Sequence, residues 1–274
     1  MAGPKTIVVL GMHRSGTSVV AGILHALGVD MGTGAEGERW IGKHWSNPTG
    51  HFENPAFLAM NQQLLGGDAT GLRGTPRWEE VGIRAEALRG EIARLIDASQ
   101  KDLWGWKDPW TVLTIEAFLP HLADPHFVIV HRPRAEVLAS LQKRSSSTDV
   151  EIGVLYDLYE RRLRDLPALL SPRPILSIDY PELLAEPQKV LARLTSFVGL
   201  RPDRDSLDRA LGMVLSGEEL HRQSQRMAVV GVLEFPRWVG WIVRRDLAAN
   251  PGTVANDLTR AVPKELFQVL RAVL

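Results

Sequence analysis

The chain contains no cysteine, so disulfide bonds, thiolate nucleophiles and cysteine-ligated metals are all excluded. It carries no excess of either charge, because 32 Lys and Arg residues balance 32 Asp and Glu residues. A net charge of zero argues against a protein that binds nucleic acid through its overall charge. No membrane-spanning run is visible: the apolar stretch near the N-terminus stops at His13 and Arg14 after about seven residues, at the short limit of a signal peptide core. We therefore expect a cytoplasmic protein in which residues 7–10 form a buried strand.

Apolar side chains make up 45% of the 274 residues, which is enough for a large core. Short apolar or β-branched runs predict strands at 7–10, 103–107, 127–130 and 174–178. Periodic segments and helix-start signals predict helices at 19–27, 54–65, 82–98, 111–121, 133–143, 150–170, 181–185 and 187–197. This alternation implies an α/β fold, a three-layer sandwich with a central, mainly parallel sheet. We expect one domain over 1–274, with a core at 1–200 and a helical extension at 201–274.

The most informative stretch is the loop at 11–18, between a β-branched strand and a periodic helix. Its spacing matches the Walker A pattern G-x-x-x-x-G-K-[ST], except that Thr17 stands at the lysine position. Such a loop aims backbone N–H groups at an anion on the helix N-terminus. Arg14 would supply the missing charge, and Thr17 and Ser18 would supply hydroxyls. The alternative is an ordinary glycine turn with a Ser/Thr helix cap, but the strand–loop–helix context favours phosphate binding.

Two further motifs follow predicted strands and so belong to the same edge of the sheet. Arg132 comes after one strand, and Ser140 lies eight residues on, about two turns into the next helix. An arginine fork and a hydroxyl on one side could clamp a second phosphate; each alone is more simply a surface residue. Lys107 and Asp108 end another strand, where a lysine can stabilise charge on a transferred group. The alternative for this pair is a solvated turn.

Glu53 and His51 lie where a long loop ends and a helix begins, and either could act as a general base. The simpler alternatives are a helix-start charge favoured by the helix dipole for Glu53 and a hydrogen-bonded loop histidine for His51. His51 and His131 could instead bind a metal, but two loop histidines without ligand spacing are weak evidence. We therefore expect no metal.

In this order the motifs resemble the sulfotransferases that use 3′-phosphoadenosine-5′-phosphosulfate (PAPS), over about residues 5–200. The resemblance implies a P-loop-like fold, and residues 106–109 are similar to bacterial members. Arg132 and Ser140 stand at the family's spacing for the 3′-phosphate site, and residues 180–184 look like its Tyr-x-x-Leu segment. The residues implied for the 5′-phosphosulfate are His13, Arg14, Ser15, Gly16, Thr17 and Ser18.

The chain also departs from the cytosolic members of that family. Those enzymes have a catalytic histidine shortly after the lysine that matches Lys107, whereas here the chain continues with Asp108 and a proline. Their glycine-rich C-terminal cofactor loop is not recognisable, and the nearest stand-in is at 224–227. A glutamate base, as in Golgi-type members, suggests Glu53, with His51 and Asp108 as alternatives.

The resemblance implies in-line transfer of a sulfonyl group from PAPS to a hydroxyl, less readily an amine, of a small-molecule, glycan or lipid-linked acceptor. Glu53 would take the acceptor proton. Arg14, Lys107 and the loop N–H groups would stabilise the charge that develops as the bond breaks. No metal is needed for this reaction.

Two other functions stay open at this point. A small-molecule kinase that uses ATP and magnesium would want the lysine that Thr17 replaces, but Asp108 and Asp179 follow strands and could hold the metal. A non-catalytic nucleotide-binding protein is the other alternative. The extension at 201–274 is expected to form an acceptor-side lid; its Trp- and Arg-rich segment at 235–245 could lie on a membrane surface, although helices of this kind more often pack on a core. A homodimer also stays open.

Overall fold

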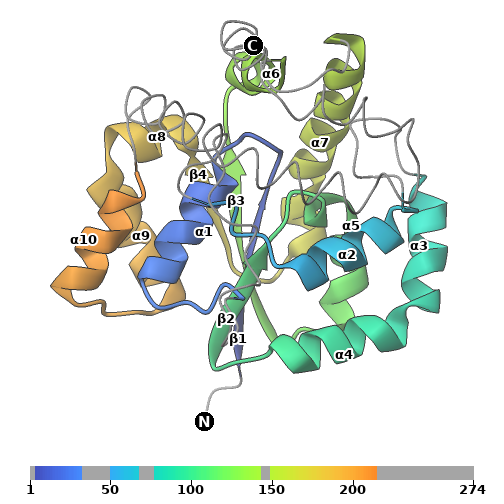
Figure 1. Ribbon diagram of the computed structural model, residues 1–274, viewed down its shortest axis with the longest axis horizontal. Helices are drawn as coiled ribbons and strands as arrows, with labels where there is room; N and C mark the ends of the chain where they lie inside the picture. Colours follow the sequence, from blue (N-terminus) through green and yellow to red (C-terminus); the bar gives the residue numbers. More distant parts are fainter. Residues whose placement is uncertain (1–3, 33–49, 68–76, 143–148, 215–274) are drawn as a thin grey trace, which may run out of the picture. The chain divides into compact units, whose positions relative to one another are not determined.

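The computed structural model describes residues 4–32, 50–67, 77–142 and 149–214, all within one compact unit. At the centre of this unit is a four-stranded parallel sheet in the order β2-β1-β3-β4 (Figure 1). The strands are β1 (Lys5–Gly11), β2 (Leu103–Lys107), β3 (Asp124–His131) and β4 (Ile175–Asp179). All four predicted strands are present, and the parallel sheet confirms the predicted α/β class.

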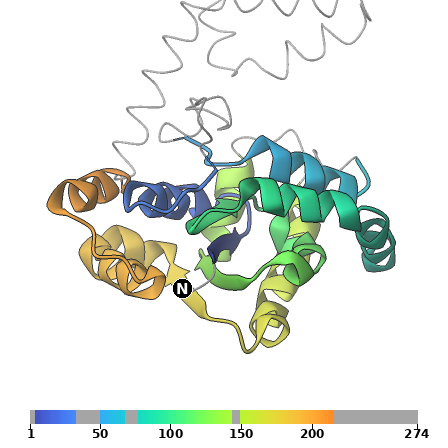
Figure 2. The same ribbon diagram turned by 90° about the horizontal axis from the view of Figure 1, so that it is seen from below.

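Helices cover both faces of the sheet and make the three predicted layers (Figure 2). One face carries α1 (Thr17–Ala26), α8 (Tyr180–Ala185), α9 (Pro187–Val198) and α10 (Arg204–Gly212). The other carries α2 (Pro55–Leu64), α3 (Trp78–Ala87), α4 (Arg89–Ser99), α5 (Thr111–Phe118), the 3₁₀ turn η1 (Leu119–His121), α6 (Arg134–Gln142) and α7 (Asp149–Leu170).

The residues of β1 alternate between two cores, because successive side chains of a strand point to opposite faces. Ile7 and Val9 pack with α1 and α9, whereas Val8 and Leu10 pack with α5 and α7. All four are fully buried. A strand covered on both faces therefore reads as an unbroken apolar run, which is the pattern that predicted it.

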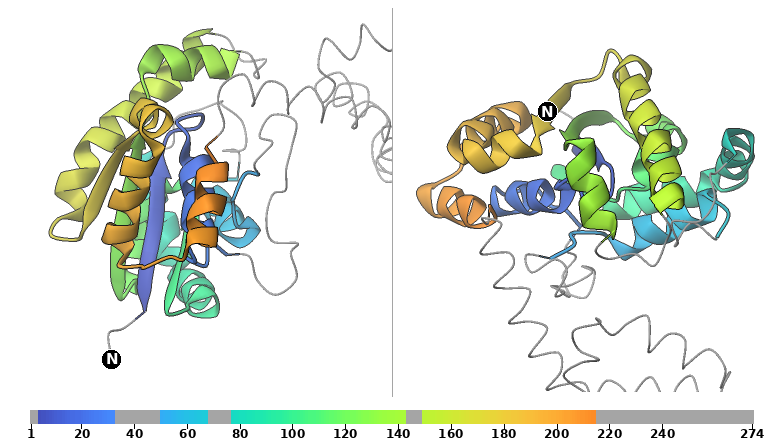
Figure 3. Two further views of the ribbon diagram at one scale, coloured as in Figure 1. Left: turned by 90° about the vertical axis from the view of Figure 1, so that its left-hand side faces the viewer. Right: turned by 90° about the horizontal axis from the view of Figure 1, so that it is seen from above.

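The carboxyl ends of the strands meet at one edge of the sheet, which faces the reader in the right-hand view of Figure 3. The chain leaves β1 towards β2 on one side and leaves β3 towards β4 on the other. Open α/β sheets bind ligands at such a switch point. The loop at 11–18 and the residues after β3 flank it.

Helix boundaries differ from the predictions in two places. The helix predicted at 82–98 is two helices, α3 and α4, which meet at Leu88 (ψ 5°). The helix predicted at 111–121 leaves the α conformation after Phe118 and continues as the 3₁₀ turn, where Pro120 lacks the N–H that an α-helix needs. By contrast, α2 begins as predicted, because Asn54 Oδ1 accepts a hydrogen bond from the Ala56 N–H.

Of the predicted extension at 201–274, only the part up to residue 214 is described, and it contains α10. The segments at 224–227 and 235–245 lie outside the described residues, so the lid and the membrane contact stay predictions. Within the described ranges, no helix combines the length and the hydrophobicity that crossing a membrane requires.

Candidate active site

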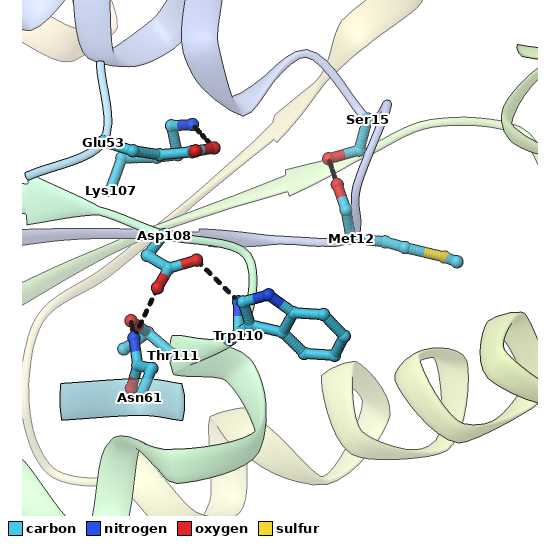
Figure 4. Close-up of polar contacts among 8 residues, drawn as sticks. All are labelled: Met12, Ser15, Glu53, Asn61, Lys107, Asp108, Trp110 and Thr111. Atoms are coloured by element: carbon cyan, nitrogen blue, oxygen red, sulfur yellow. Dashed lines mark hydrogen bonds and ion pairs between the residues drawn. The ribbon is translucent and has the colours of Figure 1, made fainter. Parts of the chain in front are cut away.

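The loop at 11–18 is a tight turn between β1 and α1. Ser15 closes it, because its N–H and its hydroxyl both donate to the Met12 carbonyl, at 3.1 and 2.7 Å (Figure 4). Arg14 (φ 67°) and Gly16 (φ 96°) have left-handed backbone conformations. Gly16 is the N-cap residue of α1, so the loop presents backbone N–H groups at a helix N-terminus. This is a favourable setting for an anion.

The first residue of α8, Tyr180, packs its ring on this loop. A methyl group at Gly16 would lie 2.1 Å from Tyr180 Cδ2, so only glycine fits under the ring. The guanidinium of Arg132 lies 4.8 Å from the centroid of the same ring. The tyrosine of the Tyr-x-x-Leu segment therefore contacts both the loop and the end of β3.

Arg14, Arg132 and Ser140, predicted to serve two phosphate subsites, are brought together. Arg132 Nη1 donates to the Arg14 carbonyl at 2.9 Å, and Arg14 Nε donates to Ser140 Oγ at 2.9 Å. On its outer side Arg132 also pairs with Glu136 of α6 at 2.9 Å. Two guanidinium groups and a hydroxyl thus gather at the switch point, and this donor set suits phosphate.

Lys107 and Glu53 form a buried ion pair at the end of β2 (Figure 4). Lys107 Nζ lies 2.5 Å from Glu53 Oε1, and the two side chains are 1% and 17% exposed. The solvated turn considered for Lys107 and Asp108 is wrong, because Asp108 is also only 1% exposed. The glutamate is likewise more than a helix-start charge, since its carboxylate is directed at the lysine.

Opposing effects set the pKa of Glu53. Burial is the largest effect and raises the pKa, but the charge and the hydrogen bond of Lys107, together with nearby histidines, hold it below the usual value. These histidines are His51 and His13, whose contributions are smaller than those of Lys107. Glu53 is therefore ionised at neutral pH and can accept a proton, with the lysine as its counter-charge.

Asp108 lies on the other side of the chain from this ion pair and faces the interior (Figure 4). Its carboxylate accepts hydrogen bonds from Asn61 Nδ2 at 2.7 Å and from the Trp110 N–H at 3.1 Å. Burial raises the pKa of Asp108 to about 6, against the hydrogen bond from Asn61 and with a contribution from the nearby Glu53 charge. Asp108 is thus held from two sides, which disfavours it as a general base.

The ring of His13 packs in an aromatic cluster behind the loop. Its centroid lies 4.8 Å from that of Trp110 and 5.8 Å from that of Tyr159, edge-on in both cases. This packing anchors the loop to α5 and α7. Of the two hydroxyl residues at the start of α1, Thr17 is buried and Ser18 is half-buried. In the described part of the chain, no group of three or more His, Cys, Asp or Glu residues is arranged to hold a metal ion.

Two residues of this region, Asn61 and Tyr159, are fully buried and were not predicted from the sequence. Asn61 holds Asp108 and in turn accepts a hydrogen bond from the Thr114 hydroxyl at 2.5 Å. The sequence did contain a sign of this role, because Asn61 lies on the apolar face of α2, between Phe57 and Leu64. A polar residue in such a stripe needs a buried partner. No comparable signal marks Tyr159, because a tyrosine fits an apolar stripe.

A model of the "Sulfotransferase family" matches residues 4–205. Similar solved structures include a sulfotransferase from Mycobacterium tuberculosis H37Rv (19% identity, TM-score 0.46, covering 83% of this chain and 77% of that one). The sulfotransferase domain of an olefin synthase from Synechococcus PCC 7002 is similar over 83% of this chain and 88% of that one (15% identity, TM-score 0.49). A retinol dehydratase in complex with androsterone and inactive cofactor PAP is similar over 83% of this chain and 65% of that one (15% identity, TM-score 0.35). A search of curated proteins gave no match.

Proposed function

Since this chain belongs to the sulfotransferase family, we propose that it transfers a sulfonyl group from PAPS to a hydroxyl of an acceptor. The observation that carries the proposal is the buried Lys107–Glu53 pair. It lies at the same sheet edge as an anion-binding loop that is hydrogen-bonded to Arg132. A proton acceptor, a buried cation and a phosphate site at one edge are the parts that such a transfer needs.

We assign the phosphosulfate end of PAPS to the loop at 11–18 and its 3′-phosphate to Arg132 and Ser140. The glycine under the Tyr180 ring and the helix N-terminus fit an anion on the loop. The hydrogen bond from Arg14 to Ser140 supports the assignment, because it joins the donors for both anionic ends in one set. This arrangement favours the binding of a nucleotide that carries phosphates at both its 3′ and 5′ positions.

In the proposed transfer Glu53 takes the proton of the acceptor hydroxyl. The acceptor oxygen forms a bond to sulfur as the bond between sulfur and the bridging phosphate oxygen breaks. The electron pair of that bond stays on the bridging oxygen, which leaves as part of the 3′,5′-bisphosphate product. Lys107 and Arg14 stabilise the charge on this oxygen.

The ion pair couples the two halves of this step. A lysine ammonium has three N–H donors, and Lys107 directs one of them at Glu53. As Glu53 takes up a proton, its attraction for the ammonium falls. Lys107 can then stabilise the leaving oxygen at the moment when that charge develops.

Two features disfavour a kinase that uses magnesium and ATP. Thr17 stands where the Walker lysine would be, and both Asp108 oxygens already accept hydrogen bonds in the interior. Asp179, at the end of β4, is exposed. The experiment below distinguishes a sulfotransferase from a protein that binds the nucleotide without turnover.

Calorimetry with 3′-phosphoadenosine-5′-phosphate (PAP), set against ATP plus magnesium, tests the proposal. We expect tight binding of PAP without metal. Arg132→Ala should weaken it by about 10- to 100-fold, since it removes a charge-assisted hydrogen bond. The control is Arg201→Ala, an exposed arginine beyond α9, which should change nothing. Tighter binding of magnesium-ATP than of PAP would overturn the proposal. If the protein binds PAP but does not consume PAPS in a turnover assay, its function is nucleotide binding alone.

We also propose that the acceptor group is a hydroxyl, that the protein acts in the cytoplasm, and that residues 201–274 form a lid on the acceptor side. Activity of the full chain on phenolic, sugar and lipid-linked alcohols would distinguish the acceptor classes.

A further inference from the structure

The side chains of Lys107 and Asp108 leave the end of β2 in opposite directions (Figure 4). Lys107 reaches Glu53, whereas Asp108 is directed towards Asn61 in the second turn of α2. Glu53 is also tied to α2, because it directly precedes Asn54, whose side chain caps that helix. The chain from Glu53 through α2 therefore contacts two consecutive residues of β2 and its end, one on each side.

The amide of Asn61 is hydrogen-bonded on every side within the protein, and the residue is 0% exposed. Its Nδ2 donates to Asp108 Oδ2 at 2.7 Å and to Thr111 Oγ1 at 3.0 Å, and its Oδ1 accepts from the Thr114 hydroxyl at 2.5 Å. Thr111 Oγ1 in turn accepts from the indole N–H of Trp106 at 3.1 Å. These bonds join α2 to the start of α5 and to β2.

An apolar residue would be the simpler choice at this position of α2. Phe57 and Leu64 on the same face are buried in the core, and Phe57 stacks on Trp106 with ring centroids 4.4 Å apart. Apolar contacts are non-directional, so by themselves they allow a helix to shift along a strand. A buried polar network is costly to desolvate, but once every member is paired it specifies one arrangement.

We propose that Asn61 is a positioning residue, whose hydrogen bond to Asp108 fixes α2 against the end of β2 and thereby sets the geometry of the buried ion pair. This inference rests on the proposed function, in which Glu53 is the base and Lys107 stabilises the leaving oxygen. Asn61 acts on the transfer through the helix that follows Glu53. A misplacement of about 1 Å at reacting groups can cost about 100-fold in rate.

The pKa of Glu53 reports the geometry of the ion pair and is measured without any substrate. Lys107 lowers this pKa, His51 and His13 lower it less, and burial raises it. Carbon-13 NMR titration of the glutamate carboxyls follows the pKa, with the Glu53 signal identified by its loss in Glu53→Gln. In Asn61→Leu the lysine should be held less closely, so the pKa of Glu53 should rise.

The direction of this shift separates a displaced ion pair from a change of charge at Asp108. Asn61 lowers the pKa of Asp108 through its hydrogen bond, so Asp108 becomes neutral more readily without it. Loss of that negative charge would by itself lower the pKa of Glu53, because a neighbouring like charge disfavours ionisation. A rise therefore reports a weaker contact between Glu53 and Lys107.

Two further variants serve as controls. Leu64→Val removes one methylene from the same buried face of α2 and leaves the polar network intact, so the pKa of Glu53 should stay as in the wild type. The double variant Asn61→Asp/Asp108→Asn exchanges the amide and the carboxylate and keeps a hydrogen bond between the two positions. It should return the pKa of Glu53 to the wild-type value or below it.

Thr114→Val takes the place of Asn61→Leu if that variant does not fold. It removes the hydroxyl that orients the Asn61 amide, so it should raise the pKa of Glu53 by a smaller amount. An unchanged pKa in Thr114→Val would then overturn the inference.

Turnover of PAPS and calorimetry with PAP connect the positioning to catalysis. On the alcohol that the full chain uses best, Asn61→Leu should lower kcat by about 10- to 100-fold. The Kd of PAP should stay unchanged, because the contact between Arg132 and the loop at 11–18 does not involve α2. The double variant should recover most of the lost kcat.

Three results would overturn the inference. An unchanged or lowered pKa of Glu53 in Asn61→Leu would show that the hydrogen bond does not set the geometry of the pair. An equal rise in Leu64→Val would reduce the effect to a general loosening of α2. A double variant that behaves like Asn61→Leu would show that a bond between these positions is not what matters. Failure of the proposed function is a separate result, because the wild type would then neither bind PAP nor consume PAPS, while the titration would still test the role of Asn61.

Discussion

Glu53→Gln perturbs the Lys107–Glu53 pair with the smallest change in shape. The two charged atoms lie 2.5 Å apart, and the lysine is 1% exposed. With an effective dielectric constant of about 20, their attraction is ~7 kcal/mol before desolvation is subtracted. The substitution leaves the ammonium buried without a counter-charge. We therefore expect the free energy of unfolding to fall by roughly 2–4 kcal/mol, towards the lower end for buried pairs because Glu53 is 17% exposed.

The double variant Glu53→Gln/Lys107→Met separates stability from catalysis. Replacing both charges by neutral groups of similar size removes the unpaired charge, so most of the lost stability should return. Activity should not return, because both the base and the cation are missing. Turnover should fall by about 10²- to 10⁴-fold in Glu53→Gln and at least as far in the double variant.

Stability is measured by urea unfolding at pH 7, and catalysis by single-turnover assays with PAPS. Both are applied to the wild type, Glu53→Gln, Lys107→Met and the double variant. PAP binding by each variant is the control for an intact loop. The reasoning is refuted if the stability losses of the two single variants simply add in the double variant, since the pair would then carry no coupling. Unchanged turnover in Glu53→Gln would remove Glu53 from the mechanism.

Other predictions concern the groups around the pair. The Asp108 pKa of about 6 lies roughly two units above its ordinary value, so the folded state holds a proton that the unfolded chain loses first. Its contribution to stability is present below about pH 4 and is lost as the pH rises through 6, by roughly 3 kcal/mol. Urea unfolding between pH 4 and pH 7 should show that the wild type loses free energy of unfolding relative to Asp108→Asn as the pH rises. If the free energies of unfolding of the two proteins change in parallel with pH, the assignment is contradicted. Gly16→Ala places a methyl 2.1 Å from Tyr180 at φ 96°, so it should cost about 1–3 kcal/mol and weaken PAP at least tenfold by calorimetry. Gly82→Ala, in the interior of α3 with open space around it, is its control and should be neutral or stabilising by up to about 1 kcal/mol; equal losses in both variants would argue against the Tyr180 contact.

Local signals were enough for most of the fold. The apolar runs predicted all four strands because a strand buried on both faces has no polar alternation. The cap at Asn54 fixed the start of α2 through one hydrogen bond. The break at Leu88 was not predicted, since the apolar spacing continues across it.

The sequence by itself determined which chemical groups stand at the ligand edge, because parallel strands end together and Arg14, Lys107 and Arg132 lie at or just after strand ends. Only the tertiary structure decided how these groups pair. Lys107 meets a carboxylate 54 positions away, and Arg14 meets a hydroxyl 126 positions away. No local pattern encodes such contacts, because they depend on how α2 and α6 pack on the sheet. The same packing buried Asp108 and placed the ring of Tyr159 against His13 behind the loop.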